Sequence, residues 1–185
     1  MPLKRLSDIF LAVVMLALVV WFFPIVALMI KRDSAGPIFF KQERVGKNEK
    51  LFYCIKLRTM HVGTKNLGTH EVSSTAITNF GRVLRRVKLD ELPQLWNVLR
   101  GEMSFVGPRP SLPTQTKILS ERNKRGIMTV IPGISGLAQI HYVNMSQPRR
   151  LASYDALYMR RASFCMDMYI VFNTILMSLK RIHQG

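Results

Sequence analysis

The sequence predicts an α+β fold dominated by helices, with a membrane helix at the N-terminus and a β-hairpin in the domain that follows. Three observations predict it. A long apolar run near the N-terminus is interrupted by Pro24. Two short apolar stretches, 38–42 and 51–58, flank a polar loop, which is typical of a β-hairpin. Apolar residues within 92–99 recur at the spacing of one helix face.

The N-terminal apolar run, Ile9–Ile30, carries no charged side chain. As a helix it would measure about 33 Å, which is long enough to cross a bilayer. Basic residues flank it on both sides, at 4–5 and at 31–32. Because basic flanks stay on the cytoplasmic side, a helix that enters the membrane, bends at Pro24 and returns satisfies both ends. We therefore expect residues 1–32 to form a re-entrant membrane helix, with a straight span as the alternative.

The composition points to an anionic partner at a membrane surface. The chain of 185 residues carries 27 Lys and Arg against 11 Asp and Glu, a formal net charge of +16. Such a balance is typical of proteins that bind nucleic acid, an anionic membrane or a phosphorylated ligand. Because 48% of the residues are hydrophobic, we expect no nucleic-acid partner and favour the membrane surface. Cys54 and Cys165 form no disulfide framework and fit a reducing compartment.

The domain that follows, residues 33–185, begins with a turn and the predicted hairpin. The second strand carries the basic residues Lys56 and Arg58. Such residues ordinarily lie on a solvent-exposed strand face, which is the alternative to a role in a site. A basic helix is predicted at 82–88, and its cations face either lipid headgroups or an anionic ligand. The chain is long enough for one modest domain with a core of its own.

Two adjacent carboxylates, Asp90 and Glu91, lie in this basic region. Pro93 suits the first turn of a helix, and Gly101 ends the helical spacing, so the acid pair is expected beside a helix N-terminus. Arg109 follows in a rigid turn. A diphosphate needs cations, helix N–H groups and often Mg²⁺ held by carboxylates, so the arrangement suits phosphate chemistry. A capped surface helix with favourably placed acids is the alternative.

Three further helices are predicted toward the C-terminus. The segment 112–125 is polar and is expected to be peripheral. The helix 149–161 contains Asp155, which either orders basic residues of a site or forms a surface salt bridge. The segment 164–179 is rich in large apolar residues with few polar interruptions. It fits an amphipathic helix in the membrane interface, with a buried core helix as the alternative.

An ordered series of motifs along nearly the whole chain resembles the monotopic phosphoglycosyl transferases, the bacterial sugar transferase family. The segments that carry the resemblance are Lys4–Asp8, Gly36–Gly46, Lys56–Met60, Lys88–Glu102 and Met103–Pro110. The resemblance implies a re-entrant helix broken by a proline and a small catalytic domain, residues 33–185, on the cytoplasmic face. It implies transfer of a phospho-sugar from a UDP-sugar to polyprenyl (undecaprenyl) phosphate, with release of UMP.

The resemblance also implies roles for individual residues. Asp90 is the expected nucleophile, which attacks phosphorus to give a covalent phospho-sugar aspartate, and Glu91 is the expected Mg²⁺ ligand. Arg109 is expected to position a phosphate oxygen. Lys56, Arg58 and Gln139 are further expected substrate-binding residues. From the basic helix 82–88, Arg85 and Lys88 are expected to bind the substrate diphosphate, with lipid headgroups as the alternative. Gln139 closes a segment, 131–139, that looks like the family's proline–glycine turn and following strand.

The expected location is the bacterial inner membrane, where the enzyme would be monotopic and catalyse the first membrane step of O-antigen, capsule or glycoprotein assembly. The sugar and the pathway stay open, because Ile140–Asn144 replaces the Gly-Arg-Asn usual in the family. The oligomeric state also stays open, with a homodimer among the alternatives. The alternative function is a non-catalytic, membrane-anchored basic module that binds anionic lipid or another polyanion.

Overall fold

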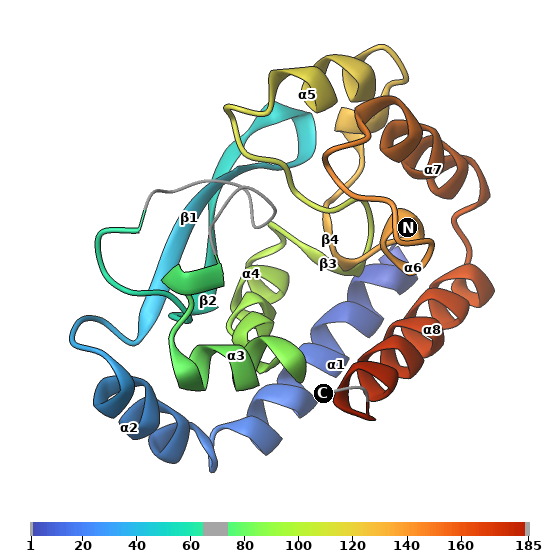
Figure 1. Cartoon of the computed structure of the whole chain (residues 1–185). Coiled ribbons are helices and arrows are strands. Elements are labelled where there is room, and N and C mark those ends of the chain that lie inside the picture. The colour runs from blue at the N-terminus through green and yellow to red at the C-terminus, as the bar shows by residue number, and fades with distance from the viewer. Residues whose placement is uncertain (1, 65–73, 184–185) are drawn as a thin grey trace.

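The structure, a computed structural model, describes residues 2–64 and 74–183. The helices, in chain order, are α1 (Pro2–Val19), α2 (Phe23–Asp33), α3 (Asn79–Arg86), α4 (Gln94–Arg100), α5 (Thr116–Asn123), α6 (Leu137–Ile140), α7 (Pro148–Arg161) and α8 (Phe164–His183). The strands are β1 (Phe39–Val45), β2 (Leu51–Leu57), β3 (Ser104–Val106) and β4 (Gly133–Ser135). The helix-dominated α+β class predicted from the sequence is therefore confirmed (Figure 1).

The N-terminal apolar run forms a bent pair of helices rather than one continuous helix. The axes of α1 and α2 differ by 68°, and Figure 1 shows them meeting at a sharp corner. The break lies just before Pro24, which occupies the first turn of α2, where its missing N–H costs no hydrogen bond. No single helix of the described residues is both long and apolar enough to cross a bilayer, whereas α1 and α2 together satisfy length and composition.

The first helix also packs on the rest of the chain. Ala12 is fully buried in a cluster that includes Phe52 of β2 and Leu95 of α4. The Arg5 guanidinium donates to the carbonyls of Val98 and Leu99, which are orphan acceptors at the C-terminal end of α4. The N-terminal helix therefore shares a core with the domain that carries the acid pair.

The predicted hairpin is confirmed. Strands β1 and β2 pair antiparallel with Phe39 opposite Leu57 and Val45 opposite Leu51. The first strand continues to Val45, three residues beyond the predicted end, and a short loop connects the two strands. Asn48 in that loop has φ 54°, a conformation that Asn tolerates better than most residues.

The segment 131–139 differs from the prediction, because the strand β4 ends at Ser135 and Gln139 lies in the short helix α6. The strand β4 pairs parallel with β3. The backbone of Gly107, just after β3, approaches Gly136 so closely that a Cβ atom on Gly136 would lie 2.5 Å from the Gly107 carbonyl oxygen. The chain turns there, and the helical turn that follows buries Leu137 and Ile140.

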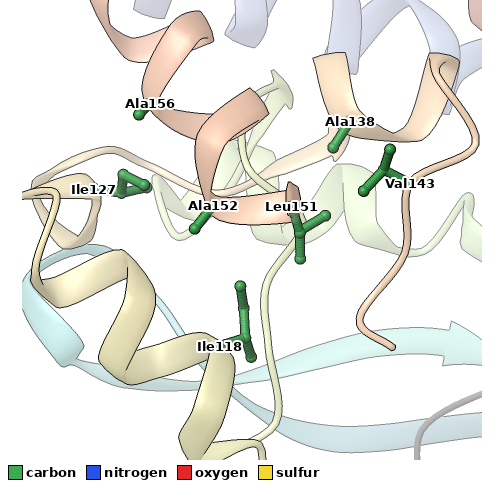
Figure 2. Close-up of a cluster of buried hydrophobic side chains, with 7 residues drawn as sticks. All are labelled: Ile118, Ile127, Ala138, Val143, Leu151, Ala152 and Ala156. Atoms are coloured by element: carbon green, nitrogen blue, oxygen red, sulfur yellow. The ribbon is translucent and has the colours of Figure 1, made fainter. Parts of the chain in front are cut away.

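The helix predicted at 112–125 is shorter and less peripheral than expected. Figure 2 shows Ile118 of α5 facing Leu151 and Ala152 of α7, and all three side chains are buried. On the same helix, the Arg122 guanidinium lies 2.8 Å from the Asp155 carboxylate. Both side chains are almost fully buried, so the surface salt bridge considered for Asp155 is wrong.

We expect Asp155→Asn to lower the free energy of unfolding by about 3 kcal/mol, because it leaves the buried Arg122 without its counter-ion. Urea unfolding of the purified protein measures the change. The double variant Arg122→Met with Asp155→Leu is the control, since it removes both charges and is expected to recover most of the loss. Equal stability of Asp155→Asn and the wild type would contradict this account of the pair.

The last helix, α8, has one buried and one exposed apolar side. Ile170 and Asp167 are buried, and the Tyr158 hydroxyl donates to the Asp167 carboxylate at 2.7 Å. Lys4 of α1 forms an ion pair with the same carboxylate. The large side chains on the other side are exposed; they are Phe164, Met168, Tyr169, Phe172, Ile175, Leu176 and Leu179. The alternative prediction for this segment, a buried core helix, is thus excluded.

Candidate active site

The acid pair lies in a single helical turn between two helices. Leu89–Glu91 forms a 3₁₀ turn, and Pro93 follows as the N-cap of α4. Lys88 precedes the turn with φ 59°, a left-handed conformation that redirects the chain out of α3. Gly101 ends α4 with φ 80°. The predicted placement of the acid pair beside a helix N-terminus is confirmed.

Glu91 is held by two cations from distant parts of the sequence. Its Oε1 atom lies 2.9 Å from Lys56 Nζ of β2 and 2.8 Å from Arg109 Nη2 in the turn after β3. Burial alone would raise the pKa of Glu91, but Arg109 and Lys56 outweigh it and hold the pKa well below its usual range. Glu91 is therefore a fixed negative charge, and it aligns the two cations.

Asp90 has the opposite environment, although it is the next residue. It is buried, and burial together with the charge of Glu91 raises its pKa to about 6, against the opposing effect of Lys56, Arg85 and Arg109. Two neighbouring carboxylates with pKa values pushed in opposite directions are typical of catalytic sites. At neutral pH Asp90 is mostly ionised, and its raised basicity makes the carboxylate a better nucleophile.

A pocket of about 750 Å³ opens at the acid pair, and all eight residues predicted for the site line it. They are Lys56, Arg58, Arg85, Lys88, Asp90, Glu91, Arg109 and Gln139. The Arg85 Nε atom donates to Thr59 Oγ1 at 2.8 Å, which fixes one end of this cation in the wall. The hairpin, the α3–α4 segment, the turn after β3 and α6 each supply part of the lining.

Arg58 lines the pocket, but its guanidinium is directed to the C-terminal end of α2. It donates to the carbonyl oxygens of Ile30, Ser34 and Ala35, where α2 ends. These contacts satisfy orphan carbonyls at a helix C-terminus, where a cation is also favoured by the helix dipole. A contact between Arg58 and substrate stays a prediction.

Gln139 reaches the pocket from α6. Its Nε2 atom donates to the Ile134 carbonyl at 3.2 Å, whereas its buried Oε1 atom has no hydrogen-bond partner among the described residues. The exposed ring of Tyr142 lines the pocket nearby, from a residue with φ 57°.

Two polar pocket residues on β1, Gln42 and Arg44, were not predicted for the site. They lie within a segment quoted for the family resemblance, where no role was given to them. The strand register places Gln42 opposite Cys54 and Phe40 opposite Lys56, so Gln42 and Arg44 share the strand face of Lys56. The period of two along the strand would have indicated this face once the register was known.

The residues of the pocket fit a Mg²⁺ ion that is bound partly by the protein and partly by the phosphates of a ligand. No group of three or more His, Cys, Asp or Glu side chains within 2–64 and 74–183 is arranged to hold a metal ion. Mg²⁺ often binds through one or two carboxylates, with substrate phosphates and water as the other ligands. Both ion pairs of Glu91 use Oε1. The Oε2 atom takes no part in these pairs and suits the role of a carboxylate ligand to Mg²⁺.

Comparison with known proteins identifies the family. The family model described as bacterial sugar transferase matches residues 1–181. The undecaprenyl-phosphate glucose phosphotransferase of Komagataeibacter xylinus is 39% identical over 93% of this chain and 35% of that protein. The exopolysaccharide production protein PSS of Rhizobium leguminosarum bv. phaseoli is 38% identical over 97% of this chain and 96% of that protein.

A third relative, the UDP-N-acetylgalactosamine-undecaprenyl-phosphate N-acetylgalactosaminephosphotransferase of Aeromonas hydrophila, is 34% identical over 94% of this chain and 43% of that protein. The chain thus spans less than half the length of some relatives and nearly all of another. The recognition drawn from the sequence motifs is confirmed: the chain belongs to the bacterial sugar transferase family of polyprenyl-phosphate phosphoglycosyl transferases.

Proposed function

We propose that this protein transfers a phospho-sugar from a UDP-sugar to polyprenyl (undecaprenyl) phosphate and releases UMP. The observation that carries the proposal is the buried Asp90, with its raised pKa, beside a Glu91 that fixes two cations in the same pocket. Relatives named for the transfer of glucose and N-acetylgalactosamine phosphates to undecaprenyl phosphate support the reaction class. A module that only binds lipid needs no such pair of carboxylates.

The reaction runs in two displacements at phosphorus. An oxygen of the Asp90 carboxylate attacks the β-phosphorus of the UDP-sugar, and the bond from that phosphorus to the bridging oxygen breaks. UMP leaves with the bonding electrons, and the phospho-sugar stays on Asp90 as a mixed anhydride. An oxygen of polyprenyl phosphate then attacks the same phosphorus, and Asp90 departs as a carboxylate.

The cations of the pocket stabilise charge on the phosphoryl oxygens during both steps. Lys56 and Arg109 are aligned by Glu91, so little reorganisation is needed when the diphosphate arrives. Arg85 and Lys88 extend the positive wall on the α3 side. Glu91 would hold Mg²⁺, which supplies further neutralisation of the diphosphate when it is bound.

The bent helix pair supports a location at the membrane interface. The side chains of Phe10, Leu18, Trp21 and Phe22 are exposed on it, which a protein surrounded by water alone would avoid. We propose that α1 and α2 enter the cytoplasmic leaflet of the bacterial inner membrane and return, and that the exposed side of α8 lies in the interface. The acceptor phosphate would then meet the pocket at the membrane surface.

UMP release from a panel of UDP-sugars, with undecaprenyl phosphate and Mg²⁺, tests the proposal. UDP-glucose and UDP-N-acetylgalactosamine come first, because relatives are named for these donors. Release that requires the acceptor lipid and yields a polyprenyl-diphospho-sugar supports the function. Binding to anionic vesicles without UMP release from any donor would favour the non-catalytic module.

The pH dependence of UMP release is expected to follow the ionisation of Asp90. Its folded pKa is about 6, and the protonated carboxyl is no nucleophile, so the rate should fall as the pH drops through that value. A divalent cation next to Asp90 lowers a carboxyl pKa, so raising the Mg²⁺ concentration should move this limb to lower pH. At limiting Mg²⁺, a rate that stays constant down to about pH 4.5 would contradict the assignment.

A further inference from the structure

Arg44 is a buried cation that the reaction described above does not use. Its side chain is almost entirely shielded from water, with the residue only 7% exposed. The guanidinium donates from Nε and Nη2 to Gln42 Oε1, and from Nη1 to the Pro110 carbonyl at 2.9 Å. All these acceptors are neutral, and among the described residues no carboxylate forms an ion pair with Arg44. A buried arginine ordinarily has a carboxylate partner.

The surroundings of Arg44 make its charge more costly. Burial, and then the nearby charge of Arg109, lower the pKa of Arg44 to about 10. The carboxylate of Glu91 also acts on Arg44, but it already forms ion pairs with two other cations, Lys56 and Arg109. The groups around the acid pair therefore hold four positive charges, Arg44, Lys56, Arg85 and Arg109, against the two negative charges of Asp90 and Glu91 before a ligand binds.

The contacts of Arg44 also connect it to a residue of the proposed reaction. Its Nη1 atom holds the carbonyl of Pro110, the residue next to Arg109, and the Ser111 carbonyl accepts from the backbone of β1 at Val45. Strand β1 thus fixes the turn from which Arg109 reaches Glu91. A neutral donor such as a glutamine could hold the Pro110 carbonyl, so the hydrogen bond alone does not explain a buried positive charge.

We propose that Arg44 is a positioning residue whose buried charge takes the diphosphate of the donor as its missing counter-ion, acting from behind Arg109. The proposal rests on the proposed function for the identity of the ligand. The diphosphate brings about two negative charges, which balance the excess that the four cations leave over Asp90 and Glu91. Arg44 need not touch the ligand, because a charge in a low-dielectric site acts over several ångströms.

Binding of UDP and of inorganic pyrophosphate to the full-length protein tests this role. Both ligands are titrated by calorimetry in magnesium-free buffer, against the wild type, Arg44→Gln, Arg44→Lys and Arg44→Met. Arg44→Gln keeps a donor for Pro110 and removes the charge, so it separates the two contributions. Lys41→Met is the matched control, because it removes a positive charge from the same strand at an exposed position.

Arg44→Gln and Arg44→Met should weaken UDP and pyrophosphate by the same factor, at least about ten-fold, whereas Arg44→Lys and Lys41→Met stay within about three-fold of wild type. UDP affinity within about two-fold of wild type in Arg44→Gln would overturn the inference, as would loss of UDP binding with pyrophosphate binding unchanged. If Arg44→Met does not fold, Arg44→Gln decides the question. If the wild-type protein binds neither ligand, the UDP-sugar donor of the proposed function is contradicted instead. The failure of the proposed function is thus distinguishable from the failure of the role of Arg44.

Discussion

Asp90→Asn is expected to lower UMP release by at least about a thousand-fold, because the amide cannot form the phospho-sugar anhydride. The asparagine side chain has nearly the same shape as the aspartate side chain, so the cations of the pocket should keep their positions. Coupled detection of UMP, with undecaprenyl phosphate and the preferred UDP-sugar, measures the loss. An Asn variant with more than about a tenth of the wild-type rate would remove Asp90 as the nucleophile.

The same variant is expected to be more stable than the wild type, which separates loss of chemistry from loss of fold. The pKa of Asp90 is about 6 in the folded protein, against an ordinary value of 3.8 for an exposed aspartate. The folded state therefore disfavours the ionised form, and this destabilisation is fully present above the folded pKa and disappears below the unfolded pKa. Asp90→Asn should gain on the order of 2 kcal/mol at neutral pH and nothing at about pH 3.5. A lower melting temperature at neutral pH would contradict this.

Glu91→Gln is expected to lower UMP release by about a hundred-fold or more and to weaken its dependence on Mg²⁺. The change removes the charge that aligns Lys56 and Arg109, and it also removes the proposed metal ligand. Rates measured across a Mg²⁺ titration give both effects. Flotation with vesicles should show unchanged membrane association, because Glu91 lies in the pocket and not on the bent helix pair.

Glu121→Gln is the matched control for this variant. Glu121 also pairs with two cations, Lys124 and Arg125, but it does so on the surface of α5, away from the pocket. Surface ion pairs contribute little, so its activity and Mg²⁺ dependence should match the wild type. If Glu91→Gln kept the wild-type Mg²⁺ dependence, Glu91 would be excluded as the metal ligand, whatever its effect on the rate.

The parts of the fold that could be predicted are those encoded by local sequence. The hairpin follows from two apolar stretches around a polar loop, and α4 follows from Pro93, the apolar spacing and Gly101. The bend follows from Pro24 within an apolar run. In each case one or two residues restrict the backbone directly, so no knowledge of distant contacts is needed.

The parts that could not be predicted depend on contacts between distant segments. Nothing near Arg58 in the sequence indicates that it caps α2, and nothing near Asp155 indicates the buried Arg122. Gln139 was expected in a strand, but close packing at Gly136 ends β4 and starts a helix. Arg44 joins the pocket only through the register of the hairpin.

The candidate site shows the same division. Its residue types and their order along the chain were sufficient to propose all eight members, because seven stand in motifs that resemble one family and Arg85 belongs to the basic helix just before the acid pair. The division of labour within the acid pair could not be predicted from spacing. It arises because Glu91 faces Lys56 and Arg109 directly, whereas Asp90 is buried beside the charge of Glu91.

The central claim is that Asp90 carries the phospho-sugar between the two substrates, and intact-mass spectrometry tests it most directly. The purified protein is mixed with the preferred UDP-sugar in the absence of polyprenyl phosphate, and then digested to locate any adduct. We predict a mass increase of one phospho-sugar on Asp90, with one equivalent of UMP released, and no adduct on Asp90→Asn. UMP release that occurs only when the acceptor lipid is present, with no adduct on the protein, would contradict the account and indicate direct transfer.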